Sequence, residues 1–472
     1  MTFHSHQFIS RDQAIMMALS FLGLVVFCYF SVIPLIIPLL VFFLGVHLFF
    51  FKKANPRLFL HLALLLALLV FVAHTLKSYS VLTYAYLPIA AVPMLTMLLF
   101  NDVQVSLLMA FLSATLAGII FGFGLNEMLI FFLGGLAGAY KVRNARTRGV
   151  LITAGIFVSV IQVMGALLIN PVINKDILIY ILKPLAVNGL VCAFVVIATL
   201  KIFEMLFGEI TNFTLMELSD SSQPLLKRMV VEAPGSYHHS LIVSNLAETA
   251  ADAIEANSLL VRVGAYYHDV GKILHPEYFT ENQIVMDNKH DELEPSMSRL
   301  VIFNHVKEGM ELARQYHLNS RIIDFIPEHH GTSTIHYFYQ KALLEGELEG
   351  MEEKDYRYPG PKPQSKETAI VLLADSVEAA TRVLDEHTPQ RIEDVVRKVI
   401  NNKFIDGQLD ECNLTLREID TIASVFARVL GAMYHSRVKY PEKSNGNQNK
   451  KSSKEDPNPP RPDPQNGTGG VA

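Results

Sequence analysis

Long apolar stretches, separated by short polar or basic breaks, occupy residues 1–207. About 20 consecutive apolar residues suffice for a helix to cross a bilayer. Buried helices of a soluble core rarely follow one another with so few charges, so the pattern predicts a polytopic helical membrane domain. The eight predicted spans are 14–29, 32–51, 58–76, 81–100, 103–123, 127–140, 150–169 and 185–207.

Two basic loops orient these spans, because loops rich in Lys and Arg stay on the cytoplasmic side. Four predicted spans separate the first loop from the second, and two more separate the second loop from the remaining chain. Both even numbers place the loops, the N-terminus and the second half of the chain in the cytoplasm. The basic residues are Lys52, Lys53 and Arg57 in the first loop and Lys141, Arg143, Arg146 and Arg148 in the second.

After residue 207 the pattern becomes polar and then helical. The stretch SDSSQP indicates a linker over 208–235, and Ser236 is a predicted helix N-cap. Apolar residues then recur at three- and four-residue spacing, without a run of alternating strand residues. The sequence therefore predicts an all-α fold, with an all-helical bundle over 236–440 after the membrane domain. Its expected helices beyond the first cover 259–270, 295–316, 320–329, 366–384, 392–401 and 416–431.

The last segment, 441–472, is rich in Pro, Asn, Lys and Ser and lacks apolar anchors. Such a segment cannot offset its ordering entropy, so we expect a disordered tail. A tail that binds a partner is the alternative to an inert one.

Charge divides the chain in the same way as hydropathy. Residues 1–207 carry 12 Lys and Arg against 5 Asp and Glu, and the remainder carries 28 against 40, which gives the net charge of −5. An acidic second half argues against a nucleic-acid polymer as the main ligand, because phosphate backbones are bound by clustered Lys and Arg. A small anionic ligand held by metal ions remains compatible with it. The three cysteines are far apart and form no Cys-x-x-Cys motif.

The candidate chemistry centres on YYHDVGK, in which His268 and Asp269 are adjacent on a predicted helix. Adjacent helical side chains point about 100° apart, so this pair can line one wall of a metal site but cannot enclose an ion. Imidazole and carboxylate ligands without thiolate suit Mn or Fe and are compatible with Zn. The other candidate ligands are His239, His305, His329, His330 and Asp375.

Seven such ligands are too many for one ion and fit two divalent ions, with Asp269 shared between them. A site with two ions activates water and stabilises both the attacking and the leaving oxygen of a phosphodiester. A single helical His is usually structural, and it is the joint order along the chain that favours a metal site. Lys272, one turn beyond Asp269, could contact a phosphate oxygen or interact with the end of its helix. We also consider stacking of an adenine on Tyr358, in the proline-rich loop 356–366.

This order of residues resembles the HD-domain phosphohydrolases. The wider sequence is similar to the membrane-anchored seven-transmembrane-receptor HD family (HDIG type), known as cyclic-di-AMP phosphodiesterases. The stretches that carry the resemblance are APGSYHHSLIVSNLAE, LLVRVGAYYHDVGKILHPEYFTENQ, IIDFIPEHHGTS, YRYPGPKPQSKETAIVLLADSVEAATR and DGQLDECNLTLREI.

The resemblance implies a hydrolase that opens cyclic-di-AMP to linear pApA in the bacterial inner membrane, with the catalytic domain in the cytoplasm. It implies one ion at His239, His268, Asp269 and Asp375, and a second ion at Asp269, His305, His329 and His330. Asp269 and Lys272 are the expected catalytic residues. Homo-oligomerisation stays open. Members of that family usually carry a large extracytoplasmic domain after the first span, a position that only a few residues around 31–34 could occupy here.

Two alternatives remain. One is hydrolysis of another nucleotide, such as cyclic-di-GMP or a guanosine alarmone. The sequence after His330 is GTSTIHYFYQ, which lacks the Gly-Tyr-Pro signature of the HD subfamily specialised for cyclic-di-GMP. The other alternative is a membrane receptor that binds a nucleotide without turnover, which the complete set of ligands disfavours.

Overall fold

The computed structural model describes residues 56–78, 84–170, 172–283, 288–345 and 352–434. Within these ranges the ordered elements are helices, and the β-type pairing is one isolated bridge between Thr334 and Arg357. The all-α prediction is confirmed for this part of the chain. The predicted spans 14–29 and 32–51 and the predicted tail 441–472 lie outside the described residues.

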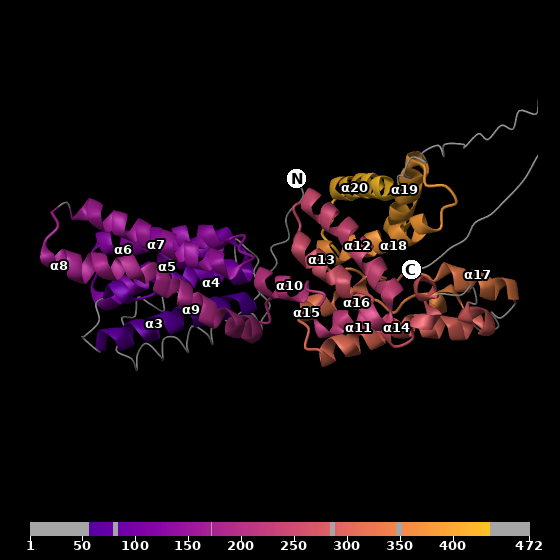
Figure 1. Cartoon of the computed structure of the whole chain (residues 1–472), viewed down its shortest axis with the longest axis horizontal. Coiled ribbons are helices and arrows are strands. Elements are labelled where there is room, and N and C mark those ends of the chain that lie inside the picture. Colours follow the sequence, from indigo (N-terminus) through magenta and orange to yellow (C-terminus); the bar gives the residue numbers. More distant parts are fainter. Residues whose placement is uncertain (1–55, 79–83, 171, 284–287, 346–351, 435–472) are drawn as a thin grey trace, which may run out of the picture. The chain divides into compact units, whose positions relative to one another are not determined.

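Among the described residues of the first half, five helices are long and apolar enough to cross a bilayer. Figure 1 shows α5, α6, α7 and α9 alongside one another, and α7 packs against both α6 and α9. The elements of this half are α3 Pro56–Ser78, the 3₁₀ turn η1 Tyr84–Tyr86, α4 Ala91–Phe100, α5 Val103–Phe121, α6 Leu125–Val142, α7 Arg148–Ile169, α8 Lys175–Ile177, the π turn η2 Leu178–Leu182 and α9 Lys183–Phe207.

The predicted span 81–100 is not one continuous helix, because its described part consists of η1 and the ten-residue α4. Pro88 lies between them, and a proline supplies no N–H and disfavours helix in the residue before it. The carbonyls of Ala85 and Leu87 instead accept hydrogen bonds from Nδ2 of Asn188, on α9, at 2.9 and 2.8 Å. Non-helical backbone at membrane depth is tolerated where protein buries it and satisfies its polar groups.

The broken segment nevertheless runs from one end of the membrane helices to the other. The ring of Tyr84 lies 4.6 Å from the ring of Phe123, just beyond the end of α5. At its other end, Asn101 lines a cavity together with Arg143 of the second basic loop. Between the two basic loops the expected four passes therefore correspond to α3, to η1 with α4, to α5 and to α6.

Two further boundaries differ from the hydropathy pattern. The span predicted over 127–140 is longer, because α6 covers Leu125–Val142. The last span begins before residue 185, since the helical path starts at Lys175 and continues through η2 into α9. As expected for a glycine-rich helix, α6 packs closely on its neighbours: a Cβ at Gly138 would lie 2.9 Å from the side chains of Met94 and Val158.

The second half is a bundle in which α12 packs against α13 and α18, and α14 packs against η3 (Figure 1). The segment predicted as a linker, 208–235, holds two helices, and α12 begins at Pro234, so Ser236 lies inside its first turn rather than at its N-cap. The helices are α10 Asn212–Leu218, α11 Pro224–Glu232, α12 Pro234–Ala253, α13 Ser258–Tyr267, α14 Pro295–Gln315, α15 Ser320–Ile323, α16 Phe325–Glu328, α17 His336–Glu345, α18 Lys366–Arg382, α19 Pro389–Ile405 and α20 Leu416–Tyr434. The 3₁₀ turns are η3 Val270–Ile273, η4 Pro276–Tyr278, η5 Thr280–Asn282, η6 Lys289–Glu292 and η7 Glu353–Tyr356.

Candidate metal centre

The seven predicted ligands come from five helices that converge in the second half of the chain. Three lie within helices: His239 in α12, His305 in α14 and Asp375 in α18. The others lie where helices end. His268 is the C-cap of α13 and is followed directly by Asp269, and His329 is the C-cap of α16 and is followed directly by His330.

Close packing of η3 on α14 brings Asp269 towards His305. A Cβ at Gly271 would lie only 1.8 Å from the carbonyl oxygen of His305, so a larger residue at this position would push the two elements apart. The glycine of the HDVGK motif therefore has a steric role, which is to let the backbone that carries Asp269 approach α14.

Asp269 lies at the centre of the cluster, and its two carboxylate oxygens face different histidines. Oδ2 lies 3.3 Å from Nε2 of His268 and 3.7 Å from Nε2 of His239. Oδ1 lies 3.6 Å from Nε2 of His305 and 3.6 Å from Nε2 of His329. This division of contacts is what a carboxylate shared by two ions requires.

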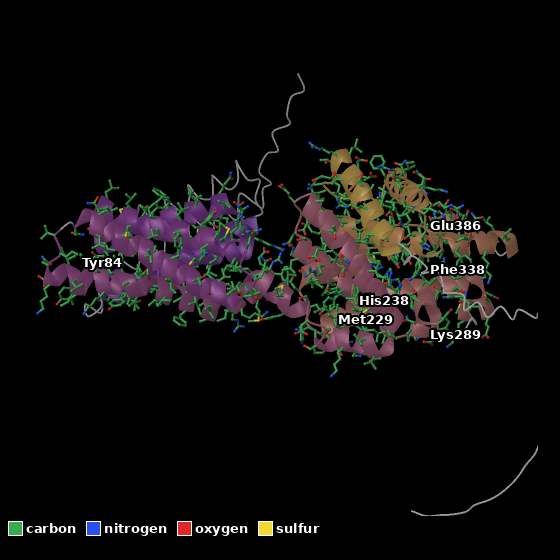
Figure 2. All side chains as sticks on the ribbon, turned by 45° about the horizontal axis from the view of Figure 1, so that its top comes forward. Tyr84, Met229, His238, Lys289, Phe338 and Glu386 are labelled. Carbon is green, nitrogen blue, oxygen red and sulfur yellow. The ribbon has the colours of Figure 1, made fainter. Side chains whose placement is uncertain are left out.

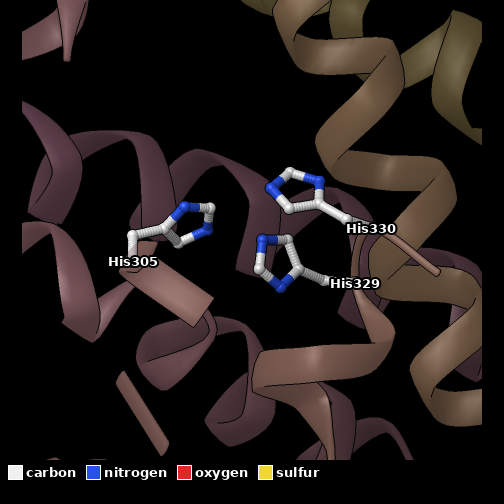
Figure 3. Close-up of side chains that lie close together, drawn as sticks. All are labelled: His305, His329 and His330. Carbon is white, nitrogen blue, oxygen red and sulfur yellow. The ribbon is translucent and has the colours of Figure 1, made fainter. Parts of the chain in front are cut away.

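The remaining ligands complete two groups. Ligand atoms of His305, His329 and His330 lie within 4.8 Å of one another, and so do those of His239, His268 and Asp375. Figure 3 shows the first group, with the rings of His329 and His330 side by side and the ring of His305 facing them. Asp375 joins the two groups, because Oδ1 lies 3.0 Å from Nε2 of His239 and Oδ2 lies 3.9 Å from Nδ1 of His330.

Several of these atoms are buried and have no hydrogen-bond partner within the protein. They are Nε2 of His268, His305 and His329 and Oδ1 of Asp269. Buried polar atoms are nearly always satisfied, so a convergent set of unsatisfied nitrogen and oxygen atoms calls for a ligand. Neutral imidazole and carboxylate are good ligands for divalent ions, and the residues therefore fit metal binding.

Hydrogen bonds on the opposite ring nitrogen orient three of the histidines. Nδ1 of His268 lies 2.7 Å from the carbonyl oxygen of Ala265, and Nδ1 of His329 lies 2.7 Å from that of Ile326. Nδ1 of His305 contacts the carbonyl oxygen of Ile302 in the same way. A carbonyl accepts only, so each Nδ1 carries the proton and each Nε2 lone pair is free for a ligand.

His239 differs, because its Nδ1 contacts a carboxylate that we did not single out from the sequence. Oε2 of Glu378 lies 2.8 Å from this nitrogen, and the Glu378 side chain is 1 % exposed. Carboxylates behind metal-binding histidines orient the ring and raise its basicity. A sequence signal was available, since Glu378 lies on α18 three residues after Asp375 and so on the same face of the helix.

Lys272 forms two ion pairs that were not considered from the sequence. Its ammonium lies 2.7 Å from Oδ2 of Asp269 and 2.8 Å from Oε1 of Glu281, on the turn η5. Burial opposes the charge of Lys272, but the two carboxylates outweigh burial and raise its pKa. Burial likewise opposes ionisation of Asp269, yet the charges of His268 and Lys272 hold its pKa well below the usual range.

His239 differs in its electrostatic surroundings from His305, His329 and His330. Burial lowers the pKa of His305 to about 4 and that of His329 to about 3, and it also lowers the pKa of His330. For His239, burial is outweighed by the hydrogen bonds to Asp375 and Glu378, which raise its pKa to about 10. Three histidines are thus kept neutral and ready to bind a metal ion near neutral pH, whereas His239 must lose a proton first.

Tyr358 is not available for the adenine stacking that we considered. Its ring stacks on the ring of His330 at 4.1 Å and 22°, Phe303 packs 4.9 Å from it, and the residue is 9 % exposed. Tyr358 therefore holds a candidate ligand in place instead of presenting a free face.

Two other histidines of the second half lie apart from the candidate ligands. His238, labelled in Figure 2 on α12, is exposed, although the adjacent His239 is buried. Nε2 of His290 bonds to the carbonyl oxygen of Tyr278 at 2.9 Å, and the ring of His290 packs against Phe338.

Comparison with known proteins agrees with this division of the chain. The curated proteins similar to the chain include two named cyclic-di-AMP phosphodiesterase PgpH. The one from Bacillus subtilis is 38 % identical over 403 residues, covering 83 % of this chain and 56 % of the relative. The one from Listeria monocytogenes is 38 % identical over 399 residues, covering 83 % and 55 %. The chain thus spans a little over half the length of these relatives.

A solved structure of the L. monocytogenes PgpH HD domain in complex with cyclic-di-AMP is 47 % identical, with a TM-score of 0.44, and covers 46 % of this chain and 100 % of that one. Residues 236–380 match the family model of the HD domain. Residues 14–211 match the family model described as a 7TM receptor with intracellular HD hydrolase. With both matches in this order along one chain, the protein is a membrane protein that belongs to the family of 7TM receptors with an intracellular HD hydrolase.

Proposed function

We propose that the protein is a membrane-anchored, metal-dependent phosphodiesterase that hydrolyses cyclic-di-AMP to linear pApA. The observation that carries the proposal is the position of Asp269, whose two carboxylate oxygens face different histidines at 3.3–3.7 Å. A shared carboxylate is the element that a centre for two ions needs and that a site for one ion does not.

In this proposal His239, His268, Asp269 and Asp375 bind one divalent ion, and Asp269, His305, His329 and His330 bind the other. The nitrogen and oxygen donors favour Mn or Fe. Two bound ions would activate the attacking water and neutralise charge on the phosphate. The protein keeps His305, His329 and His330 neutral by burial, and Lys272 together with Glu281 holds the carboxylate of Asp269 in its orientation.

The identity of the substrate rests on the relatives. Two curated relatives are named cyclic-di-AMP phosphodiesterases, and the solved HD domain that is 47 % identical contains cyclic-di-AMP. A cyclic dinucleotide is also compatible with the acidic second half, since it is a small anion that metal ions can hold without an extended basic surface. We further propose that this half lies in the cytoplasm. Basic loops stay on the cytoplasmic side, and an even number of expected passes separates the loop of Arg57 from the loop of Arg143. A further even number of passes separates the loop of Arg143 from the second half.

A product assay tests the proposal. The full chain, in lipid nanodiscs and loaded with Mn or Fe, is incubated with cyclic-di-AMP, cyclic-di-GMP and a guanosine tetraphosphate, and the products are separated by chromatography. We expect linear pApA from cyclic-di-AMP and slower turnover of the other two. Faster turnover of either of these would make it the substrate instead. A chain that retains its metal and binds cyclic-di-AMP without product would be a receptor, and the hydrolase proposal would be wrong.

The double variant His268→Ala with Asp269→Ala separates catalysis from a trace contaminant in the same assay. It removes His268 from the group of His239, His268 and Asp375, together with the shared carboxylate. Turnover should disappear together with bound metal, which is measured by elemental analysis. Activity that survives in this variant would exclude the site described above.

A further inference from the structure

A cyclic dinucleotide carries two phosphates on opposite sides of one ring. When one phosphate is held for cleavage between two ions, the other remains a negative charge close to the same centre. A buried or half-buried anion is stabilised by a cation that can form charge-assisted hydrogen bonds. The question is which cation near the centre has donors to offer.

Two cations near the centre are already neutralised. The ammonium of Lys272 contacts the carboxylates of Asp269 and Glu281. The guanidinium of Arg357 binds both oxygens of Asp406, at 2.9 and 3.2 Å. Neither is a good partner for an additional anion, because its charge is compensated by carboxylates.

Lys403, near the end of α19, is different. Its Nζ donates to Oγ of Ser333 at 2.7 Å, a neutral partner, and no ion pair to a carboxylate is formed by it within the described residues. An ammonium has three donors, so two remain for an anion. The side chain is half-buried, and burial lowers the pKa of Lys403 while Asp375 and Asp406 oppose that shift.

The backbone around Ser333 ties this ammonium to the wall of the candidate centre. The N–H of Ser333 donates to the carbonyl oxygen of His330 at 3.1 Å, and the carbonyl oxygen of Ser333 accepts from the N–H of Tyr358 at 3.0 Å. His330 and Tyr358 stack on each other at the edge of the histidine group. Lys403 is therefore connected to the candidate ligand His330 through Ser333, whose hydroxyl accepts from Lys403 and whose N–H donates to His330.

We propose that Lys403 is a specificity-determining residue that binds the second, uncleaved phosphate of the cyclic dinucleotide. This inference rests on the proposed function. It predicts that the chain distinguishes a substrate with two phosphates from a phosphodiester with one, and that the distinction is made by a residue that belongs to neither group of metal ligands.

The test compares two substrates on the full, Mn-loaded chain in nanodiscs: cyclic-di-AMP, with two phosphates, and bis(p-nitrophenyl) phosphate, with one. Lys403→Met should lower kcat/KM for cyclic-di-AMP about ten- to a hundredfold, mostly through KM, as expected for the loss of a charged hydrogen bond. Its hydrolysis of bis(p-nitrophenyl) phosphate should fall much less, because this substrate has no second phosphate for Lys403 to bind. Lys403→Arg should recover most of the loss.

Lys398→Met is the matched control, because Lys398 is an exposed lysine on the same helix. It should leave both substrates unaffected. An equal loss on both substrates, or no loss on cyclic-di-AMP, would overturn the assignment of Lys403. Wild-type protein that cleaves bis(p-nitrophenyl) phosphate but not cyclic-di-AMP would overturn the proposed function instead, and the assignment with it.

Discussion

Nδ1 of His239 lies 2.8 Å from Oε2 of Glu378, whereas the other histidines oriented through Nδ1 in the candidate centre contact a main-chain carbonyl. A carboxylate is charged and a carbonyl is not. His239 is therefore expected to be the most basic imidazole of the centre, and the two groups of ligands should differ in their affinity for metal.

Glu378→Gln tests this difference. The amide keeps an acceptor for Nδ1 but removes the charge, so the group of His239, His268 and Asp375 should lose about 10- to 100-fold in metal affinity while the fold persists. Manganese bound per chain is measured by elemental analysis after dialysis against limiting metal. Glu393→Gln, on the exposed surface of α19, is the control and should bind as the wild type does. Unchanged metal content in Glu378→Gln would contradict the role of the carboxylate.

Lys272→Met should destabilise the metal-free protein much more than the metal-loaded one. Without the ammonium, the buried carboxylates of Asp269 and Glu281 have no cation, a change that typically costs about 3–5 kcal/mol. Bound metal would compensate Asp269. Thermal unfolding in EDTA and in excess Mn measures both states.

A second substitution supplies the control for Lys272. Adding Glu281→Gln to Lys272→Met removes one of the two uncompensated charges and should recover part of the stability in EDTA. If Lys272 instead acts only on the substrate phosphate, Lys272→Met would have the thermal midpoint of the wild type in EDTA. Only its turnover of the substrate would be lost.

The metal-free protein should be most stable near pH 6.5. Unfolded histidines titrate near 6.5, but burial holds His305 at a pKa of about 4 and His329 at about 3, so the unfolded chain binds more protons below pH 6.5. Their contribution is complete above pH 6.5 and is lost as pH falls towards these values. His239, raised to about 10, contributes stability that is complete below pH 6.5 and is lost as pH rises towards 10.

Thermal midpoints of the EDTA-treated chain, measured from pH 5 to 9, check both limbs. The acidic limb should fall by about 1 kcal/mol per histidine and pH unit. His305→Gln removes one of the groups and should make that limb shallower, while leaving the basic limb as it is. A midpoint that does not change with pH would exclude these protonation states.

The proximity of the candidate ligands could be predicted from the sequence because their types are specific and their order is distinctive. All seven predicted ligands lie in one cluster. The contacts of the supporting residues could not be predicted, because they depend on packing between distant elements, and the position of Glu378 one turn after Asp375 was only a local signal. Glu378 reaches His239 only because α12 and α18 are neighbours, and Tyr358 is covered only because His330 turns its ring towards it.

In the membrane half, too, contacts between residues far apart in the sequence could not be predicted. Hydropathy located the apolar segments, because composition over about 20 residues is enough to predict a span. Hydropathy could not predict the break before α4, because it carries no information on which residue donates a hydrogen bond to the carbonyls at the break. Pro88 was a local signal for the break, but the partner of these carbonyls, Asn188, lies about a hundred residues later in the chain.

Asn188 should therefore be more important for stability than an ordinary polar residue of a membrane helix. Its side chain is fully buried, Nδ2 donates to the carbonyls of Ala85 and Leu87, and its Oδ1 lies 3.6 Å from Sγ of Cys192. Asn188→Leu fills a similar volume but leaves the carbonyl of Ala85 unsatisfied, at a cost of about 1–3 kcal/mol, and leaves that of Leu87 with only the N–H of Ile89.

The expected result is a lower thermal midpoint for the full chain in detergent. Cys192→Ala removes weak thiol contacts, to the same asparagine and to the backbone of Ala90 and Ala91, and should lower the thermal midpoint less. Below its midpoint, Asn188→Leu should retain full metal content, because the candidate centre lies in the second half. If Asn188→Leu were as stable as the wild type, the carbonyls of the broken segment would have to find other partners, and Asn188 would not be what holds that segment in place.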